Sequence, residues 1–169
     1  MELSDEYISL IIDGMSSDKC HLPYKANLVQ SSTTVKQKIM GAKQHGFRRS
    51  LHRFLPHVPT SSNMACDVVM EEIIARQEDC IANNKPFPHT LSVQIDGGSD
   101  NAALDFYAFC ELLVRLDVFE SVEVNRLPVG HTHEDIDAMF GTLWKALQRK
   151  TIATPQEWQR YALAAFNVE

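Results

Sequence analysis

The sequence predicts an α/β fold with a mixed β-sheet of about five strands, in the order β-β-β-α-β-α-β-α, and with helices packed on both faces. Three observations support this prediction. Short apolar runs alternate with longer segments of helical periodicity, two of those runs end at the dipeptide Asp-Gly, and 44% of the 169 residues are hydrophobic. A chain of this length is close to the usual size of one domain. We therefore expect residues 1–169 to form one domain, with 148–169 as a helical extension of it.

The first part of the chain is predicted to form three strands. Tyr7–Ile12, with the sequence YISLII, is a continuous apolar run that ends at Asp13-Gly14. Such a run is typical of a central strand, buried on both faces, that is followed by a turn. Val35–Gly46 and Phe47–Val58 place basic residues among apolar ones, which indicates two further strands that form a hairpin.

The rest of the chain alternates helices with strands. The predicted elements are a helix from Ser61 or Ser62 to about Asn84, a strand at Leu91–Ile95, a helix capped by Ser99 or Asp100 that reaches Val114, a strand at Val122–Leu127, a helix from Ile136 to Leu147 and a helix at Pro155–Phe166. The apolar stripe of the first helix is predicted at Cys66, Val69, Met70, Ile73, Ile74 and Ile81. Because parallel crossovers are right-handed, we expect the strand at Leu91 to lie beside the strand at Tyr7.

The composition argues against several classes of protein. The chain has no stretch of about 18 apolar residues, and its N-terminus MELSDEY carries acids where a signal peptide carries basic residues. We therefore expect a soluble, intracellular protein with no membrane partner. Wide and irregular cysteine spacing favours reduced, packed thiols over a zinc ribbon. The four cysteines are Cys20, Cys66, Cys80 and Cys110.

Basic residues are concentrated in one region of the chain. The net charge is −6, yet no acid occurs between Lys19 and Cys66, and this window holds eight of the 16 lysines and arginines. The window thus carries +8 and the remainder −14. Such a region is either a surface for a polyanion or the solvated face of a hairpin. The residues that we expect to contact nucleic acid are Lys36, Lys38, Lys43, Arg48, Arg49 and Arg53.

Two aspartates are expected to form the centre of a metal site. Asp13 and Asp96 each follow a predicted strand, and ligands of α/β sheets gather at the carboxyl ends of parallel strands. On neighbouring strands the two carboxylates would repel each other unless a divalent cation lies between them. Oxygen ligands of this kind suit Mg²⁺ or Mn²⁺. Asp-Gly is also a common turn dipeptide, so each aspartate alone could simply be a turn residue.

The segment GHTHEDIDAMF, residues 130–140, adds further ionisable groups. Thr132 and Asp135 fit a helix capping box, and the acids of the first turn suit the helix dipole. Capping alone does not explain why the segment also contains His131 and His133. Histidines in this position could bind metal, move protons or orient a neighbouring acid.

The helical wheel of this segment selects a third acid. With Ile136 on the apolar stripe, Asp137 and His133 lie at the edge of the stripe, whereas Glu134 points away from it. We therefore predict that Asp137 completes the site with the two strand-end aspartates, and that His133 is a further metal ligand.

A zinc site is the other interpretation of the two histidines. The pattern H-x-H-x-D also opens the metal motif of metallo-β-lactamase-like hydrolases. That motif continues with a histidine where this chain has Ile136, and no histidine follows His133 to supply the remaining ligands.

Together these residues resemble the RNase H-like catalytic core of DDE/DDD transposases and integrases. The order of elements and the two strand-end aspartates fit that core, and Ile136-Asp137-x-x-Phe140 is similar to the acid-x-x-aromatic signature on its last catalytic helix. More closely, the chain resembles uncharacterised transposon-derived proteins of eukaryotic genomes, over roughly Tyr7 to Leu147. The motifs that carry this resemblance are IIDGM-x-x-x-K-C-x-L-P, the strand end Q-I-D with Asn101 after it, and LPVGHTHEDID-x-MF.

The resemblance implies a DDD site. Asp13, Asp96 and Asp137 would hold two Mg²⁺ or Mn²⁺ ions for phosphodiester cleavage or strand transfer. It further implies DNA as partner, is compatible with a homo-oligomer on DNA, and implies a nuclear location in a eukaryote. Two alternatives stay open: an inactive, domesticated module that binds DNA or protein, and a zinc-dependent hydrolase. Accessory roles in the site are expected for His131, Glu134, Asp135 and Asn101.

Overall fold

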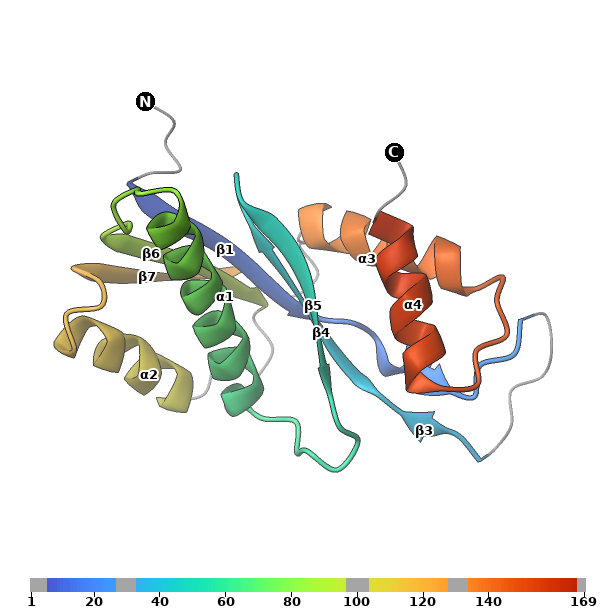
Figure 1. Ribbon diagram of the computed structural model, residues 1–169. Helices are drawn as coiled ribbons and strands as arrows, with labels where there is room; N and C mark the ends of the chain where they lie inside the picture. Colours follow the sequence, from blue (N-terminus) through green and yellow to red (C-terminus); the bar gives the residue numbers. More distant parts are fainter. Residues whose placement is uncertain (1–5, 27–32, 97–103, 128–133, 167–169) are drawn as a thin grey trace.

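The apolar run at the start of the chain becomes β1, Tyr7–Gly14, of the computed structural model, which describes residues 6–26, 33–96, 104–127 and 134–166 (Figure 1). The predicted order of the main strands and helices is confirmed. After β1 the elements are the 3₁₀ helix η2 Ser17–Lys19, β2 His21–Leu22, β3 Val35–Lys36, β4 Lys38–Gln44, β5 Arg48–Phe54, α1 Ser62–Ala82, β6 Thr90–Asp96, α2 Leu104–Arg115, β7 Ser121–Leu127, α3 Glu134–Leu147 and α4 Pro155–Phe166.

Strand β1 lies at the centre of the main sheet because it pairs along both of its edges. The five strands are ordered β5-β4-β1-β6-β7. β1 is antiparallel to β4 and parallel to β6, and β6 is in turn parallel to β7. The mixed sheet and the pairing of the strands at Tyr7 and Leu91 are therefore as predicted.

Each face of this sheet carries its own apolar core, because β1 is apolar on both faces. Ile8, Leu10 and Ile12 belong to a core closed by α1 and α2. Ile11 belongs to a second core closed by α3 and α4. Figure 1 shows the two pairs of helices on either side of the sheet. Successive side chains of β1 point to opposite faces of the sheet, so the position of a residue on the strand decides which pair of helices its side chain contacts.

The apolar stripe predicted for α1 is confirmed at Val69 and Ile73, which are buried, and at Cys66, which packs against the core, but it is wrong at its other three positions. Met70, Ile74 and Ile81 are 37%, 45% and 74% exposed, although the stripe places them in the core. The face that packs against the sheet includes Glu72 and Arg76. The reason is a set of polar side chains on β5 that bind Glu72, so a charged position turns inward and part of the apolar stripe turns outward.

The predicted strand Val35–Gly46 is divided by the structure. Its first two residues form β3, which pairs with β2 in a separate two-stranded sheet. Gln37 separates β3 from β4, and its backbone N–H and its side-chain Nε2 both donate to the Cys20 carbonyl, at 3.1 and 3.3 Å. The chain thereby changes partner from β2 to β1 within one residue.

The segment after α3 packs into the second core. Ile152 forms an isolated bridge with Tyr24, and Trp158 and Ala162 of α4 are buried against α3. No helix in the described part of the chain is long and apolar enough to cross a membrane. All four cysteines are free, as predicted, and burial raises the pKa of the Cys20 thiol to about 12.

Candidate active site at the ends of β1 and β6

The backbones of the two predicted aspartates lie side by side. In the parallel pair of β1 and β6, Ile12 is opposite Ile95, and Asp13 and Asp96 are the next residues on their strands. Neighbouring strands are about 4.8 Å apart. The Asp13 carboxylate is half-buried, and its Oδ1 accepts a hydrogen bond from the Gly14 N–H at 2.7 Å.

Helix α3 crosses the sheet next to Asp13. Asp13 follows Ile11 by two residues, so alternation places its side chain on the face covered by α3. Its register partner on β4 is Gly41. A Cβ atom at Gly41 would lie 2.5 Å from Met139 Cε and 2.8 Å from the Phe140 ring, so only glycine lets α3 approach this closely.

The start of α3 is tied to β4 through Asp135. Lys43 Nζ lies 2.6 Å from Asp135 Oδ2, and His45 Nε2 lies 3.1 Å from the same oxygen. The hydrogen bond from Lys43 and that from His45 hold the pKa of this carboxyl below its usual range. Ser9 Oγ is hydrogen-bonded to the other ring nitrogen of His45, at 3.0 Å. Asp135, predicted as an accessory residue, therefore serves as a tether between α3 and β4.

Asp137 lies on the opposite flank of α3 from Asp135. At about 100° per residue, the two acids stand on either side of Ile136, which is fully buried. Trp144, two turns further on, shares the flank of Asp137 and packs edge-on against Tyr24, with 5.4 Å between ring centroids. Asp137 is exposed, and the helical spacing places it away from the Lys43 tether.

The convergence of the three acids stays a prediction. The Asp96 side chain, Asn101, both histidines and the Glu134 side chain lie outside what the structure describes. Within the described residues, no group of three or more His, Cys, Asp or Glu side chains is arranged to hold a metal ion. The described residues include Asp13 and Asp137, whereas His131 and His133 lie outside them.

Three of the six basic residues predicted to bind DNA are already engaged within the chain. Lys43 pairs with Asp135, and Arg48 forms an ion pair with the fully buried Glu72 at 2.9 Å. Lys38 donates a hydrogen bond to a backbone carbonyl. A phosphate contact by any of these side chains would compete with a contact that supports the fold.

The other three basic residues are held weakly or not at all. Lys36 lies 3.8 Å from Asp18, and both side chains are largely exposed. Exposed pairs of this kind contribute little to stability. Arg53 donates to Gln37 at a long 3.5 Å, and Arg49 makes no ion pair with any residue that the structure describes.

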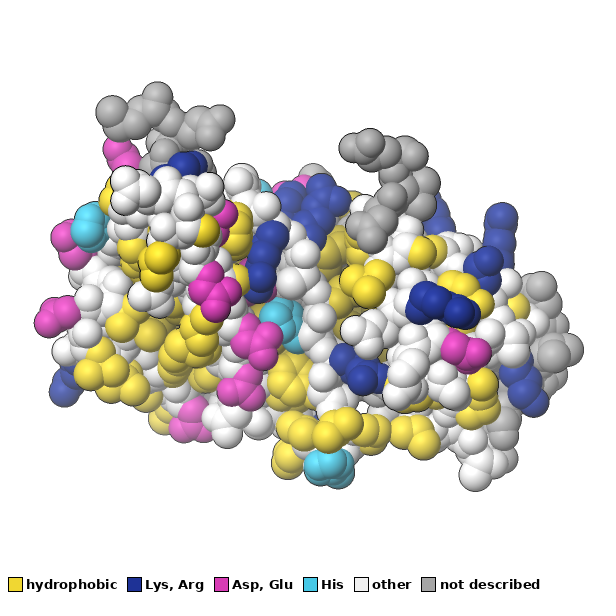
Figure 2. Space-filling view, in the orientation of Figure 1, with side chains coloured by type: hydrophobic (Ala, Val, Ile, Leu, Met, Phe, Trp, Pro, Cys, Tyr) yellow, Lys and Arg dark blue, Asp and Glu magenta, His cyan; other side chains and the backbone are white. Residues whose placement is uncertain are grey.

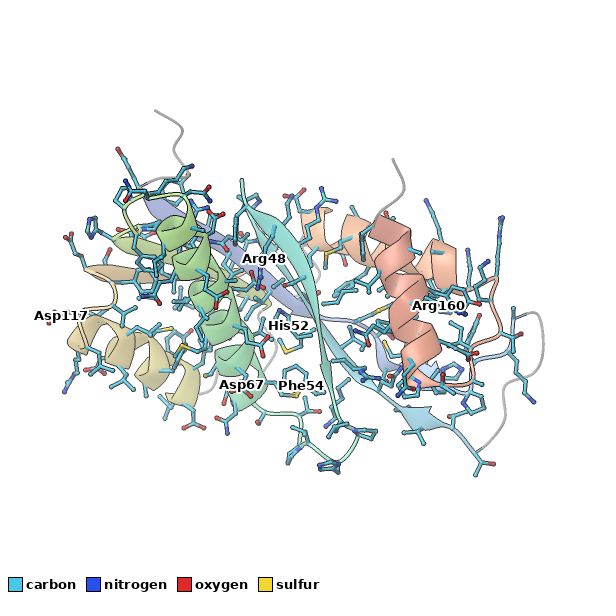
Figure 3. The ribbon with its side chains drawn as sticks, in the orientation of Figure 1. Arg48, His52, Phe54, Asp67, Asp117 and Arg160 are labelled. Carbon is cyan, nitrogen blue, oxygen red and sulfur yellow. The ribbon has the colours of Figure 1, made fainter. Side chains whose placement is uncertain are left out.

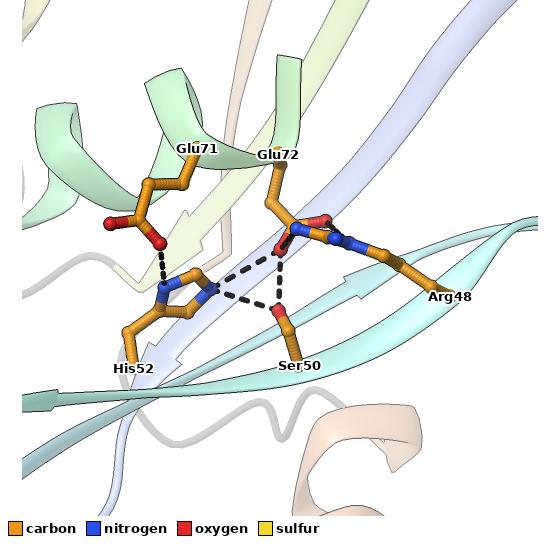
Figure 4. Close-up of polar contacts among 5 residues, drawn as sticks. All are labelled: Arg48, Ser50, His52, Glu71 and Glu72. Carbon is orange, nitrogen blue, oxygen red and sulfur yellow. Dashed lines mark hydrogen bonds and ion pairs between the residues drawn. The ribbon is translucent and has the colours of Figure 1, made fainter. Parts of the chain in front are cut away.

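A polar network that the sequence analysis missed connects β5 to α1 (Figure 4). The Glu72 carboxylate accepts two hydrogen bonds from Arg48, both at 2.9 Å, and one from the Ser50 hydroxyl at 2.5 Å. His52 Nε2 lies 3.2 Å from Glu72, and its Nδ1 lies 3.0 Å from Glu71. Arg48 and His52 lie between β5 and α1 (Figure 3).

The network keeps Glu72 ionised although the side chain is fully buried. Burial raises the pKa of the carboxyl, but hydrogen bonds from His52, Arg48 and Ser50 outweigh this effect and lower the pKa to about 2. A signal for the network exists in the sequence, because Arg48, Ser50 and His52 occupy every second position of one strand. Three hydrogen-bond donors on one face of a strand predict that the element packed against that face carries an acceptor such as a carboxylate.

Ser50, His52 and Glu71 are linked in the order of a serine-hydrolase triad, with 2.8 Å between Ser50 Oγ and His52 Nε2. In such a triad the histidine takes the serine proton. Here the Ser50 hydroxyl donates its hydrogen bond to the ionised Glu72 carboxylate, so its proton is engaged with Glu72 and not with His52. The arrangement is therefore a structural clamp between β5 and α1.

The strand order and the crossing helix define the class of fold, which is RNase H-like. A chain in the crystal structure of the Mos1 strand transfer complex has the same fold, with a TM-score of 0.58 and 10% sequence identity. The match covers 100% of this chain and 49% of that chain, so this chain spans about half its length. The model of a family described as a domain of unknown function, DUF7869, matches residues 27–169, and the chain belongs to that family. A search of curated protein sequences finds no match.

Proposed function

We propose that the chain catalyses metal-dependent phosphodiester cleavage or strand transfer on DNA, with Asp13, Asp96 and Asp137 as metal ligands. The observation that supports this most directly is the parallel pairing of β1 with β6, which aligns Asp13 and Asp96 at the carboxyl ends of adjacent strands. Open α/β sheets bind their ligands at such ends. The fold shared with a chain of the Mos1 strand transfer complex agrees with this chemistry.

The residues fit a divalent cation of the hard, oxygen-binding type. Asp13 is a half-buried carboxylate beside a second aspartate, and Asp137 is an exposed acid on the flank of α3 away from Lys43. Such a set suits Mg²⁺ or Mn²⁺, which take carboxylate oxygens and retain several waters. When bound, a pair of these ions activates water or a 3′-hydroxyl and stabilises the leaving oxygen. Asp13 would hold its part of the site through the rigid strand, and Asp137 through the helix fixed at Gly41.

DNA is the proposed partner, held by its phosphates. Lys36, Arg49 and Arg53 are exposed and weakly engaged, so they are the members of the basic set best suited to contact phosphate. Each such contact would release counterions and make affinity fall with salt. Homo-oligomerisation on DNA and nuclear location remain expectations from the resemblance.

The experiment is a nicking assay on supercoiled plasmid in Mn²⁺, with Asp→Asn variants at each proposed ligand. We expect nicking to fall at least a hundredfold in Asp13→Asn, Asp96→Asn and Asp137→Asn, since each loses a ligand and a charge. Asp117→Asn is the matched control. It makes the same charge change at the far end of α2 (Figure 3), at a residue with φ 56° where asparagine is tolerated.

Three outcomes would count against the proposal. Loss of nicking in Asp135→Asn but not in Asp137→Asn would move the third acid to Asp135. A wild-type chain that binds DNA without nicking it in Mn²⁺ or Mg²⁺ would favour the inactive, domesticated module. Stoichiometric zinc binding that is lost in His131→Ala and unchanged in Asp13→Asn would favour the zinc hydrolase.

A further inference from the structure

A groove of about 1000 Å³ lies along β5, on the far side of β4 and β1 from β6. Its lining combines basic residues of the β4–β5 hairpin with one face of α4. Figure 2 shows hydrophobic side chains next to lysines and arginines in this part of the surface. The groove is separate from the proposed active site, which lies two strands away.

The floor of the groove is the open edge of β5. The consecutive residues 48–51 all line it, although side chains of successive strand residues point to opposite faces. Residues whose side chains point to opposite faces of the sheet can line the same groove where that groove follows the edge of the strand. β5 pairs with β4 alone within the described chain, so its outer N–H and C=O groups have no strand partner there.

One wall of the groove is cationic. Among the described residues no acid lines it, and two of the four basic residues that do, Lys43 and Arg48, are neutralised by internal ion pairs. Arg49 and Arg53 remain. They are exposed, and they flank Leu51 on the face of β5 that points towards α4.

The other wall is apolar and only partly covered. Leu163 lines the groove and is 59% exposed, and Phe166 is half-buried beside it. Trp158, deeper in the wall, is 4% exposed, and its buried indole Nε1 has no hydrogen-bond partner among the described residues. A groove with these walls offers an occupant both apolar contacts and free hydrogen-bonding groups.

We propose that β5 accepts an extended segment of another polypeptide as an added strand. The segment would carry acidic residues opposite Arg49 and Arg53 and an apolar residue opposite Leu51, in the pattern acidic-x-apolar-x-acidic. Main-chain hydrogen bonds to the strand edge supply affinity in this mode, and alternate side chains supply specificity. Opposite charges across paired strands stabilise the pairing.

Two other occupants fit the groove less well. A second copy of β5, paired antiparallel about Leu51, would place Arg49 opposite Arg53, and like charges in that position destabilise the pair. A nucleic acid backbone would satisfy the arginines, but it has no row of N–H donors for the β5 carbonyls and makes no use of the apolar wall at Leu163. The proposal is independent of the proposed nuclease function, although DNA and peptide would compete for the two arginines.

The test is fluorescence anisotropy with a labelled nine-residue peptide that carries this pattern. We expect saturable binding that is lost when alternate residues of the peptide are N-methylated, because N-methylation removes the donors needed for strand pairing. Arg49→Ala combined with Arg53→Ala should weaken binding about tenfold, as should Leu163→Gln. Arg149→Ala, an exposed arginine outside the groove, should leave binding unchanged.

Backbone amide exchange on the wild-type chain gives a second readout, which does not depend on whether the variants fold. Peptide should slow amide exchange in Arg48–Phe54 and leave β7 at the other edge unchanged. Equal binding of the N-methylated peptide would overturn strand addition. The proposal also fails if the peptide does not bind while a single-stranded oligonucleotide binds through Arg49 and Arg53 regardless of Leu163, since the groove would then be a nucleic acid surface.

Discussion

Glu72 is a charged side chain in the core that stays charged because three polar side chains, those of Arg48, Ser50 and His52, bind its carboxylate. Its 0% exposure means that water cannot take over the role of any group that is removed. Removing one partner of a buried ion pair is strongly destabilising, because the other charge is left buried and unpaired. The clamp between β5 and α1 should therefore depend steeply on single substitutions.

Replacement of Arg48 by alanine should lower the free energy of unfolding by about 3–5 kcal/mol. The cause is the loss of both hydrogen bonds that Arg48 donates to Glu72. Urea denaturation followed by far-UV circular dichroism measures the change. Glu71→Gln is the control, because this carboxylate is 68% exposed and its contact with His52 should contribute less than about 1 kcal/mol. An equal, small effect of both substitutions would show that the network adds no stability.

The same carboxylate predicts how stability varies with acid. The pKa of Glu72 is about 2 in the folded chain against 4.5 as its ordinary value. A lowered pKa contributes stability above the ordinary value, and that contribution is lost as the pH falls from 4.5 towards 2. The free energy of unfolding of wild type should therefore decline more steeply in this range than that of Glu72→Gln. Parallel pH profiles of the two proteins, measured by urea titration at each pH, would contradict the assignment.

Residue positions differ in how far the sequence could predict them. Asp13 and Asp96 were predictable as neighbours, because each ends a buried strand and the handedness rule orders those strands. The hydrogen bond between Arg48 and Glu72 joins residues 24 positions apart, so the local periodicity of the sequence does not predict it. A buried charge looks like a surface charge in a sequence until its partner is known.

At the scale of elements, the contact between β4 and α3 controls where Asp137, the proposed third acid, lies. Gly41 lies against Met139 and Phe140 of α3, and it is also the register partner of Asp13. Anything that pushes α3 away from Gly41 also moves Asp137 relative to the strand ends. Packing in this place is therefore connected to the proposed chemistry.

Gly41→Ala should destabilise the chain by about 1–3 kcal/mol, because the added methyl group meets Met139 and Phe140 below van der Waals distance. Mn²⁺-dependent nicking should fall as well, at temperatures where the variant is still folded. The matched control is Gly141→Ala within α3, where the Cβ meets nothing within 4 Å and the helix should gain up to about 1 kcal/mol. Thermal denaturation and the nicking assay measure the two effects. A Gly41→Ala variant as stable as wild type would show that α3 repacks without cost.

The type of nearly every main element was predictable, because strands and helices follow different periods. The inward face of α1 was predictable only in part. Its inward face is chosen by the polar side chains of β5 as well as by apolar residues, so Ile74 and Ile81 remain exposed. The pair of short strands β2 and β3 was missed for a related reason, since two residues are too few to show a period.

At the scale of the molecule, α4 completes the second core, so the extension predicted from the sequence is not dispensable. A chain that ends at Ala153 would expose the apolar underside of α3 by removing Trp158 and Ala162. We expect this truncated chain to lose its cooperative thermal transition, as recorded by circular dichroism. A chain that ends at Phe166 serves as the truncation control. Full retention of the transition in the shorter chain would show that the first core suffices.

Strand β1 contributes to both cores, and this makes a simple test of cooperativity possible. Both tryptophans of the chain, Trp144 and Trp158, report on the core beneath α3 and α4, and neither lies in the core beneath α1 and α2. Tryptophan fluorescence therefore follows one half of the molecule, whereas far-UV circular dichroism follows all of its helices. If β1 leaves its place in the sheet, both cores lose the side chains that it contributes. The two signals should therefore change at the same urea concentration. Two separate midpoints would mean that the sheet can open on one face while the other stays packed.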